Sequence, residues 1–386
     1  MNISEEVEKI YPFLVSTRRY LHEHPESSLK EYETSKFIKQ ELDKINIDYV
    51  TVGETGVLAE IKGKNAGKTI FLRADMDALE MNDAKDADYK SKNQGLNHAC
   101  GHDAHTAALL GATKILATKK DKLNGNIKIA FQPAEEIGAG ARLFVRAGYL
   151  KDVDLAFGLH VSSELETGKL KITDGAVSAS CDIFTINVDG QSAHASTPQL
   201  GKDAALATAS ILVELQSLIS RQKSPFTPAV ISIGVIEAGT RYNVIAAKGK
   251  IQGTLRTLEK YLRTKLLNKI EKVAKNVAQI HDCTATFENY DAASVLVNDK
   301  NATRFVTDVA NKIVGDENIL NNSVPSLGAE DFADYSEVCP SCFAYVGTNN
   351  GEKTSYPAHS EKFDIDEEAL KIACQFHINV ALEYLK

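Results

Sequence analysis

The 386-residue sequence lacks the features that mark a membrane-spanning, exported or nucleic-acid-binding protein. It contains no apolar run of about 18 residues, so we expect no membrane span. Its N-terminal segment has no basic stretch followed by an apolar core, so we expect no signal peptide. Acidic residues outnumber basic ones by 52 to 44. This balance disfavours nucleic acid or an anionic membrane as a partner.

Cysteine is sparse, with six residues in the whole chain. In a chain without an export signal, these cysteines are expected to be reduced thiols, which predicts a cytoplasmic protein. Cys339 and Cys342 form a C-x-x-C pair, but no second pair accompanies it. We therefore interpret these two cysteines as ordinary loop and strand residues.

Motifs for other kinds of chemistry are also missing. The sequence has no G-x-S-x-G nucleophile elbow and no Walker phosphate loop. Gly138 and Gly140 could begin a dinucleotide-binding turn, but Leu143 stands where the third glycine is needed. Serine-nucleophile and nucleotide-binding functions are thus disfavoured.

The composition is that of a folded protein, with 43% hydrophobic and 25% charged residues. A chain of this length usually forms two domains. In the first part, helical periodicity over about 5–23, 32–45, 103–116 and 139–147 alternates with strand-like segments. The strand-like segments are 56–63, 69–79, 126–131 and 155–161. This alternation predicts an α/β domain with a mainly parallel central sheet flanked by helices.

The pattern changes after Gly175. Four strand-like segments and two helical segments follow in the order β-α-β-β-α-β, which is typical of a ferredoxin-like α+β domain. The segments are 180–190, 203–220, 230–239, 246–258, 259–280 and 283–290. We therefore expect a discontinuous α/β domain, residues 1–178 and 293–386, with an inserted domain at 179–292.

Potential metal ligands follow the predicted strands of the first domain. Cys100-Gly101-His102 precedes a helix, and Gly101 would let the backbone turn so that the two side chains converge. Thiolate, imidazole and carboxylate are ligands for zinc and its neighbours. The other candidates are Glu135, Glu136, His160 and His359. Because ligands bind at the carboxyl ends of strands in open α/β sheets, the joint pattern predicts a metal site.

The neighbouring carboxylates leave several interpretations open. Glu135 and Glu136 lie in an extended segment, so one can face a metal and the other its bound water, and spacing does not decide which. Asp75 or Asp77 could orient a ligand histidine. Asp103 could cap a helix or hydrogen-bond a ligand. Taken singly, each segment also fits a solvated loop or an ordinary core histidine.

With these residues assembled, the chain resembles the aminoacylase/carboxypeptidase family of dinuclear-metal peptidases, in its amidohydrolase branch. This branch includes hippurate hydrolases, N-acyl-amino-acid amidohydrolases and hydrolases of indoleacetyl–amino-acid conjugates. The similar stretches run in order over essentially the whole chain. They are RRYLHEHPE (18–26), FLRADMDALE (71–80), NHACGHDAHTAALLGA (97–112), FQPAEE (131–136), FGLHV (157–161), GQSAHASTP (190–198), IQGTLRTL (251–258), GAEDFADY (328–335) and AHSEKFD (358–364).

The resemblance implies two divalent ions about 3–4 Å apart. It implies five ligands, namely Cys100, His102, Glu136, His160 and His359, with Cys100 in the bridging place that aspartate holds in other branches. Other branches have histidine at the position of Arg73, and His102 would supply that ligand here. Asp75 and Asp103 are expected to orient the ligand side chains by hydrogen bonds without contacting the metal themselves.

The resemblance also implies roles for Glu135 as general base and for His194, in the inserted domain, as an oxyanion stabiliser. Asn243 and Arg256 would hold the substrate carboxylate. In relatives the histidine reaches into the partner subunit, so we expect a homodimer, or a higher oligomer, with the insert as a lid and dimerisation domain.

The expected function is a metal-dependent amidohydrolase that cleaves N-acyl-L-amino acids to a carboxylic acid and an amino acid through a metal-activated water. The ligand types suit zinc, cobalt or nickel, and manganese is the harder alternative. The enzymatic alternative is a dipeptidase or other exopeptidase, or an N-acetyl-diaminopimelate deacetylase, on the same scaffold. The non-enzymatic alternative is a ligand-binding protein descended from such an enzyme.

Overall fold

The computed structural model describes residues 2–321 and 323–386. The chain divides into two compact units. Unit 1 consists of Met1–Gly175, Val297–Val324 and Asp331–Lys386, and unit 2 consists of Ala176–Leu296 and Pro325–Glu330. Each unit has its own buried apolar cluster. Within the described residues, no helix is both long enough and apolar enough to span a membrane.

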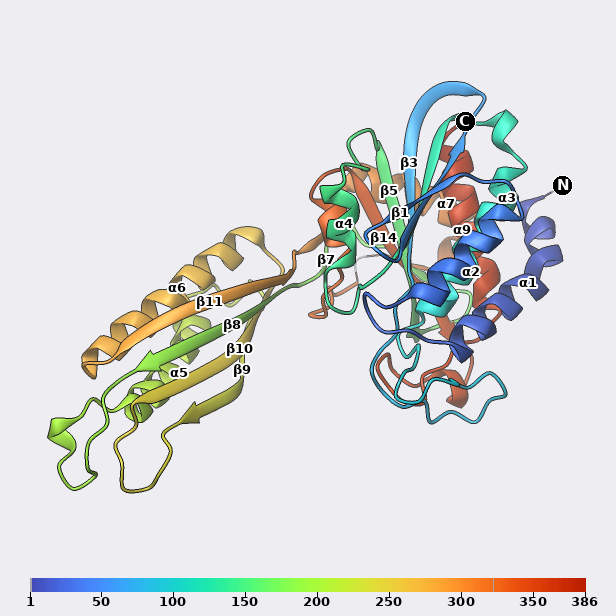
Figure 1. Ribbon diagram of the computed structural model, residues 1–386. Helices are drawn as coiled ribbons and strands as arrows, with labels where there is room; N and C mark the ends of the chain where they lie inside the picture. The colour runs from blue at the N-terminus through green and yellow to red at the C-terminus, as the bar shows by residue number, and fades with distance from the viewer. Residues whose placement is uncertain (1, 322) are drawn as a thin grey trace. The chain divides into compact units, whose positions relative to one another are not determined.

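Unit 1 contains an eight-stranded sheet in the order β1-β2-β4-β3-β5-β14-β6-β13. Its strands are β1 (Tyr49–Val52), β2 (Gly56–Lys62), β3 (Asn65–Asp75), β4 (Asn124–Gln132), β5 (Leu155–Glu166), β6 (Leu170–Lys171), β13 (Ile319–Leu320) and β14 (Ser341–Asn349). The helices beside it are α1 (Ile3–Glu23), α2 (Tyr32–Asp43), α3 (His102–Ala117), α4 (Gly140–Arg146), α7 (Lys300–Val314), α8 (Ala333–Ser336) and α9 (Ala369–Tyr384). In Figure 1, α4 lies on the opposite side of the sheet from α1, α3 and α9.

The prediction of a mainly parallel sheet is wrong in part, because the sheet is mixed. The four central strands β4, β3, β5 and β14 are parallel to one another. Towards the edges, β1 pairs antiparallel with β2, β2 with β4, and β6 with β14. Short turns explain two of these reversals, because a connection of three residues joins β1 to β2 and another joins β5 to β6. Parallel neighbours need a crossover of a dozen residues or more.

The central strands are buried because helices cover the sheet. Residues Ile70 and Leu72 of β3 belong to the large apolar cluster that includes residues of α1, α3 and α9. Phe71, between them in sequence, contacts the rings of Phe144 and Tyr335 from α4 and α8. Alternate residues of one strand thus meet different helices. Strands β3 and β4 end in register, at Asp75 and Gln132.

Unit 2 follows the order β-α-β-β-α-β with a four-stranded antiparallel sheet, β11-β8-β10-β9. Its elements are β8 (Ser180–Asp189), α5 (Ala204–Arg221), β9 (Ala229–Ala238), β10 (Lys248–Thr257), α6 (Lys260–Ile280) and β11 (Thr284–Ala293). Alternate residues of β8, namely Phe184, Ile186 and Val188, are buried with apolar residues of α5 and α6. Two short strands, β7 (Gly175–Ser178) and β12 (Leu296–Asn298), complete the described elements.

A buried arginine ties α1 to the start of α3. Arg18 donates to Asp103 at 2.9 Å and to Asp364 at 2.6 Å. His22, one turn further along α1, lies 2.7 Å from the same Asp103 oxygen through its Nδ1. Burial by itself would raise the pKa of Asp103, but Arg18 and His22 hold it well below its usual range. Charge pairing with α1 therefore holds the first turn of α3 in place.

We predict that Arg18→Met destabilises the protein by about 3–5 kcal/mol, because it leaves a buried carboxylate without its cation. The matched control is Arg19→Met. Arg19 also pairs with an acidic residue, but 46% of its side chain is exposed, against 1% for Arg18. The control should cost about 0–1 kcal/mol. Urea unfolding of the three proteins checks this, and equal losses for the two variants would contradict it.

Candidate metal centre

The turn before α3 brings Cys100 and His102 together. Gly101 has φ 88° and is the N-cap of the helix. A Cβ at this position would lie 2.4 Å from Cγ2 of Val161 on β5. Only glycine therefore fits both the left-handed backbone and the close approach of β5. Of the two roles left open for Asp103, helix capping is excluded, because the capping position falls two residues earlier.

His102 is oriented by the end of the β3 segment. Its Nδ1 lies 3.0 Å from the carbonyl oxygen of Asp77 and 3.3 Å from a carboxylate oxygen of the same residue. Because a carbonyl oxygen only accepts, Nδ1 carries a proton. Burial lowers the pKa of His102, but Asp75 and Asp77 raise it well above its usual value, so a cation at Nε2 would displace a proton and take up the lone pair there. Within the described residues, this buried Nε2 has no hydrogen-bond partner. It is therefore available as a ligand.

His160, near the middle of β5, is oriented in the same manner. Its Nδ1 lies 2.6 Å from the carbonyl oxygen of Val161, and its Nε2 lies 3.4 Å from Sγ of Cys100. Burial lowers the pKa of His160 to about 3, so the ring is neutral near pH 7. A neutral imidazole with its lone pair on Nε2 is the form that binds metals.

The two adjacent glutamates follow the end of β4. The carboxylate of Asp77 accepts the backbone N–H groups of both Glu135 and Glu136, each at 3.1 Å. Ala134, just before them, has φ 56°, and its N–H donates to the buried carboxylate of Glu31 at 2.9 Å. A non-glycine residue in this conformation persists only where its surroundings hold it. The backbone bonds of Asp77 and Glu31 provide that restraint.

His359 comes from a C-terminal loop that docks beside Cys100. The backbone of His359 is also left-handed, with φ 65°, and its N–H donates to the carbonyl of Ala99 at 2.8 Å. Its Nε2 lies 3.5 Å from Oε2 of Glu136. A loop more than 250 residues away in sequence thus reaches the turn that carries Cys100.

The candidate ligand atoms form overlapping groups in which all members lie within 4.8 Å of one another. One group is Cys100, His102 and His160, another is Cys100, Glu136 and His359, and a third is His102, Glu135 and Glu136. Cys100 and His102 each belong to two of these groups. The structure therefore gathers all five predicted ligands and the predicted base in one place.

The electrostatics of this cluster favour a bound cation. Burial raises the pKa of the Cys100 thiol and raises that of Glu136 to about 7. Oε1 of Glu136, like Nε2 of His102, is buried without a hydrogen-bond partner among the described residues. A divalent cation would stabilise the thiolate and carboxylate and would satisfy both unpaired atoms. The donor set of sulfur, nitrogen and oxygen fits such an ion.

The two predicted supporting aspartates lie further from the ligands than expected. Asp103 contacts Arg18 and His22, and neither is a predicted ligand. Oδ2 of Asp75 lies 3.6 Å from Nε2 of His102, whereas its Oδ1 lies 2.5 Å from Nδ1 of His105. It is Asp77 that contacts Nδ1 of His102. The sequence left Asp75 and Asp77 as alternatives because both stand at the same strand end.

Sequence reasoning missed His105 and the contacts of Arg73. The buried guanidinium of Arg73 donates to Gln132 at 2.9 Å, to Asp75 at 2.7 Å and to Asp331 at 2.8 Å. Arg73 is thus engaged by acceptors where other branches were expected to have a ligand. His105 stands three residues after His102 on α3, so helical spacing alone places the two rings on one face.

The predicted residues of unit 2 lie on three segments, the loop after β8, the loop between β9 and β10, and β10 itself. His194 forms an isolated bridge with Val244, and the carbonyl of Asn243 accepts the N–H of Ala195 at 3.1 Å. His194 and Asn243 are therefore neighbours. Nδ1 of His194 accepts the N–H of Ser196 at 3.1 Å. Arg256, on β10, donates to the carbonyl of Leu327 at 2.9 Å.

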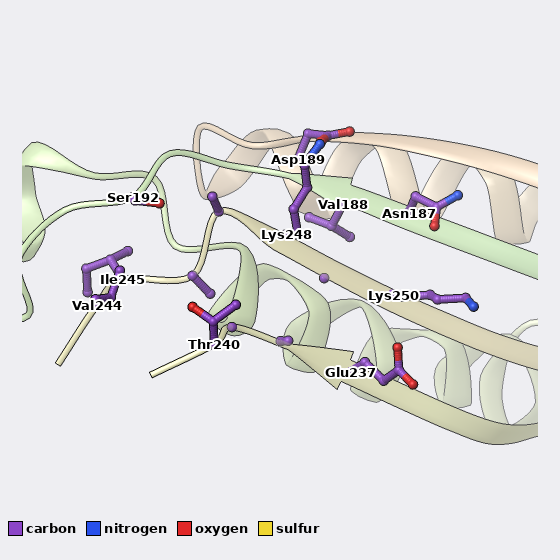
Figure 2. Close-up of a pocket in the computed structure, with 15 residues that line it drawn as sticks. Asn187, Val188, Asp189, Ser192, Glu237, Thr240, Val244, Ile245, Lys248 and Lys250 are labelled. Carbon is purple, nitrogen blue, oxygen red and sulfur yellow. The ribbon is translucent and has the colours of Figure 1, made fainter. Parts of the chain in front are cut away.

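A hollow of about 460 Å³ borders the segment that follows Asn243. Figure 2 shows it between the ends of β8 and β9 and the start of β10, with Lys248 beside Asp189. These two side chains form an ion pair. The lining includes Val244, Ile245 and Ala246 but none of the predicted site residues.

Comparison with known proteins identifies the family. The description "Peptidase family M20/M25/M40" matches residues 71–383. This stretch contains all five predicted ligands and Glu135. The chain belongs to peptidase family M20/M25/M40.

Similar members of the M20/M25/M40 family cover nearly the whole chain. The N-acetylcysteine deacetylase of Bacillus subtilis is 37% identical over 375 residues, 97% of each chain. The thermostable carboxypeptidase 2 of Saccharolobus solfataricus is 36% identical over 388 residues, 99% of this chain and 98% of the relative. A crystal structure described as a dinuclear metal binding peptidase of the M20 family, from B. subtilis, has a TM-score of 0.84 at 34% identity. The match covers 98% of this chain and 99% of the B. subtilis chain.

We predict that Gly101→Ala destabilises the metal-free protein more than Gly168→Ala does. Both glycines have positive φ, 88° and 97°, but a Cβ at Gly168 would meet nothing within 4 Å. The control should cost about 1–2 kcal/mol from its backbone conformation. Gly101→Ala should cost about 1–3 kcal/mol more, because its Cβ collides with Val161. Denaturant unfolding of the two variants measures the difference, and equal losses would contradict the assigned clash.

Proposed function

We propose that this protein is a metal-dependent amidohydrolase that cleaves N-acyl-L-amino acids into a carboxylic acid and a free amino acid. The observation that carries the proposal is the convergence of the Cys100, His102, His160, Glu136 and His359 donor atoms, with Glu135 among them. Membership of the family supports the reaction class. The deacetylase relative, whose name specifies N-acetylcysteine, supports the substrate class.

Two divalent cations would be held by these five residues, with Cys100 shared between the sites. The name of the B. subtilis structure, which specifies dinuclear metal binding, supports this number. When bound, such cations lower the pKa of a water molecule and polarise the amide carbonyl. The sulfur and nitrogen donors suit zinc, cobalt or nickel, and manganese remains the harder alternative.

Glu135 would act as the general base. Its backbone N–H is fixed by Asp77, whose peptide carbonyl also orients His102. Asp77 thus orients the ligand His102 and also fixes the backbone of the segment that carries Glu135. Glu135 would accept a proton from the attacking water and then deliver it to the leaving nitrogen. The leaving group departs as a neutral amine and becomes the amino acid product.

Unit 2 would bind the carboxylate end of the substrate and would act as a lid and dimerisation domain. Arg256 has the fork-shaped guanidinium that suits a carboxylate, and Asn243 supplies an amide beside His194. Asn243 precedes the start of β10 and Arg256 stands near its end, so the two residues would reach one substrate from different subunits of the proposed dimer. His194 would donate to the developing oxyanion, an interaction whose removal typically costs about 3–4 kcal/mol of barrier.

The outer edge of unit 2 supports dimerisation. Strand β9 is the last strand of its sheet, so its outer backbone groups can pair with a second copy. Large apolar side chains are exposed nearby, including Ile236 at 50% and Val213 of α5 at 68%. In the proposed dimer these side chains would be covered together with the free edge of β9.

A carboxypeptidase is the second candidate, because the S. solfataricus relative carries that name. Both reactions cleave an amide whose nitrogen belongs to an amino acid with a free carboxylate. They differ in the acyl side, which is a simple acid in one case and a peptide in the other. A substrate panel of N-acetyl, N-benzoyl and indoleacetyl amino acids beside dipeptides and longer peptides separates them.

The proposed function predicts that chelated protein is inactive and that zinc, manganese, cobalt or nickel restores hydrolysis of at least one acyl amino acid. The release of free amino acid, measured by a ninhydrin assay, reports turnover. Glu135→Gln should keep the metals but lose nearly all turnover, whereas Cys100→Ala should lose metal measured by elemental analysis. Near-normal turnover in Glu135→Gln, or unchanged metal content in Cys100→Ala, would contradict the roles proposed for these residues.

We further predict that subunits carrying His194→Ala and Glu135→Gln complement one another. If His194 acts across a dimer, mixed dimers contain one intact site, so unfolding and refolding the two inactive variants together should restore part of the activity. Each variant refolded alone is the control. Absence of recovery in a mixture shown to contain heterodimers would place His194 in the site of its own subunit.

A further inference from the structure

Val161 connects three parts of the candidate metal centre. Its carbonyl oxygen accepts the Nδ1–H of His160 at 2.6 Å, and its N–H donates to Nε2 of His105 at 2.9 Å. Its Cγ2 fills the space in which Gly101 would otherwise carry a Cβ. The position of Val161 therefore affects both the ring of His160 and the turn between Cys100 and His102.

The backbone of β5 loses one strand neighbour just before this point. The pairing of β3 with β5 ends at Arg73 and Gly158, while β14 continues alongside β5 on the other side to Val161 and beyond. A buried N–H without an acceptor costs about 1–3 kcal/mol. His105 supplies an acceptor to Val161 beyond the end of the β3 pairing. The side chain of His105 thus accepts a backbone N–H of β5 at a point where β3 no longer pairs with it.

Both nitrogens of His105 are already used. Nδ1 donates to a carboxylate oxygen of Asp75 at 2.5 Å, which leaves Nε2 as the acceptor for the N–H of Val161. Asp75 is itself held by Arg73 at 2.7 Å, and all three side chains are fully buried. His105, Asp75 and His102 form a group whose atoms lie close enough to hold a metal. The bonds of His105 nevertheless leave no nitrogen for a cation.

We propose that His105 is a positioning residue of the metal centre and not one of its ligands. Arg73 holds Asp75, Asp75 fixes the tautomer of His105, and His105 fixes the peptide of Val161. Val161 then directs Nε2 of His160 towards Cys100. The inference rests on the proposed metal-dependent function, because positioning has meaning only if Cys100 and His160 bind metal.

Two substitutions of His105 separate the hydrogen bond to Val161 from the bond to Asp75. In His105→Gln the side-chain oxygen can reach the position of Nε2 and accept the N–H of Val161. In His105→Asn the shorter amide can donate to Asp75 but cannot reach Val161. We expect the Gln variant to bind Co(II) within about threefold of wild type. The Asn variant should bind about 10–100-fold more weakly, as is typical when a partner of a ligand is lost.

The measurement is competition for Co(II) between the metal-free protein and a chromophoric chelator, with circular dichroism and thermal unfolding as controls of folding. Wild-type affinity in His105→Asn, or equal weakening in both variants, would overturn the proposal. Wild-type protein that binds no Co(II) would instead refute the metal centre itself, and the role of His105 would fall with it.

A measurement on the unmodified protein is independent of how the variants fold. Protein with ¹⁵N-labelled histidine is loaded with ¹¹³Cd, and the ring nitrogens of the ligands then couple to the metal. His102 and His160 should show this coupling through Nε2, whereas His105 should keep its Nδ1–H and show none. Coupling between ¹¹³Cd and His105 would overturn the proposal.

Discussion

Two backbone carbonyls, those of Asp77 and Val161, decide how the candidate metal centre works. Each accepts the Nδ1–H of a histidine, which leaves Nε2 as the ligand atom of both rings. Nε2 of His160 lies 3.4 Å from Sγ of Cys100, and Nε2 of His102 is buried without a hydrogen-bond partner among the described residues. In a histidine that is free to rotate or to change tautomer, the lone pair would face many directions. Because both rings are already fixed, a cation would bind with little further loss of conformational entropy. The carbonyls can do this because both residues are buried, Asp77 just after the end of β3 and Val161 within β5.

The scaffold also has to accommodate charge in a buried place. Asp75 and Asp103 flank the ligand turn, and both are fully buried. Each has its own buried arginine, Arg73 for Asp75 and Arg18 for Asp103. No arginine is paired with Cys100 or Glu136 among the described contacts, where the nearby bases are histidines, and burial raises the pKa of both groups. The protein thus neutralises the supporting carboxylates internally and leaves the ligand cluster to be neutralised by metal. The presence or absence of a paired arginine thus distinguishes the supporting carboxylates from the ligands.

Strained backbone occurs where the chain must present these groups. Ala134 and His359 are non-glycine residues with positive φ, and they stand next to or within the ligand cluster. Each is held by a backbone hydrogen bond to a distant part of the chain, Glu31 in one case and Ala99 in the other. Such conformations persist only where the surroundings hold them, and they gather at functional sites.

The sequence by itself determined which residue types could bind metal, and that they follow strands, because ligand chemistry and hydrophobic periodicity are local properties. It also indicated the order of elements in both units and the glycine needed at position 101. It left open whether Asp75 or Asp77 supports His102, and it predicted a mainly parallel sheet without the antiparallel pairs that the structure shows towards the edges. Tertiary structure decided these points, since strand pairing depends on which segments meet in space. The role of His105 was hidden for the same reason. A histidine becomes a ligand or a support according to what its second nitrogen touches, and that partner, Val161, is 56 residues away.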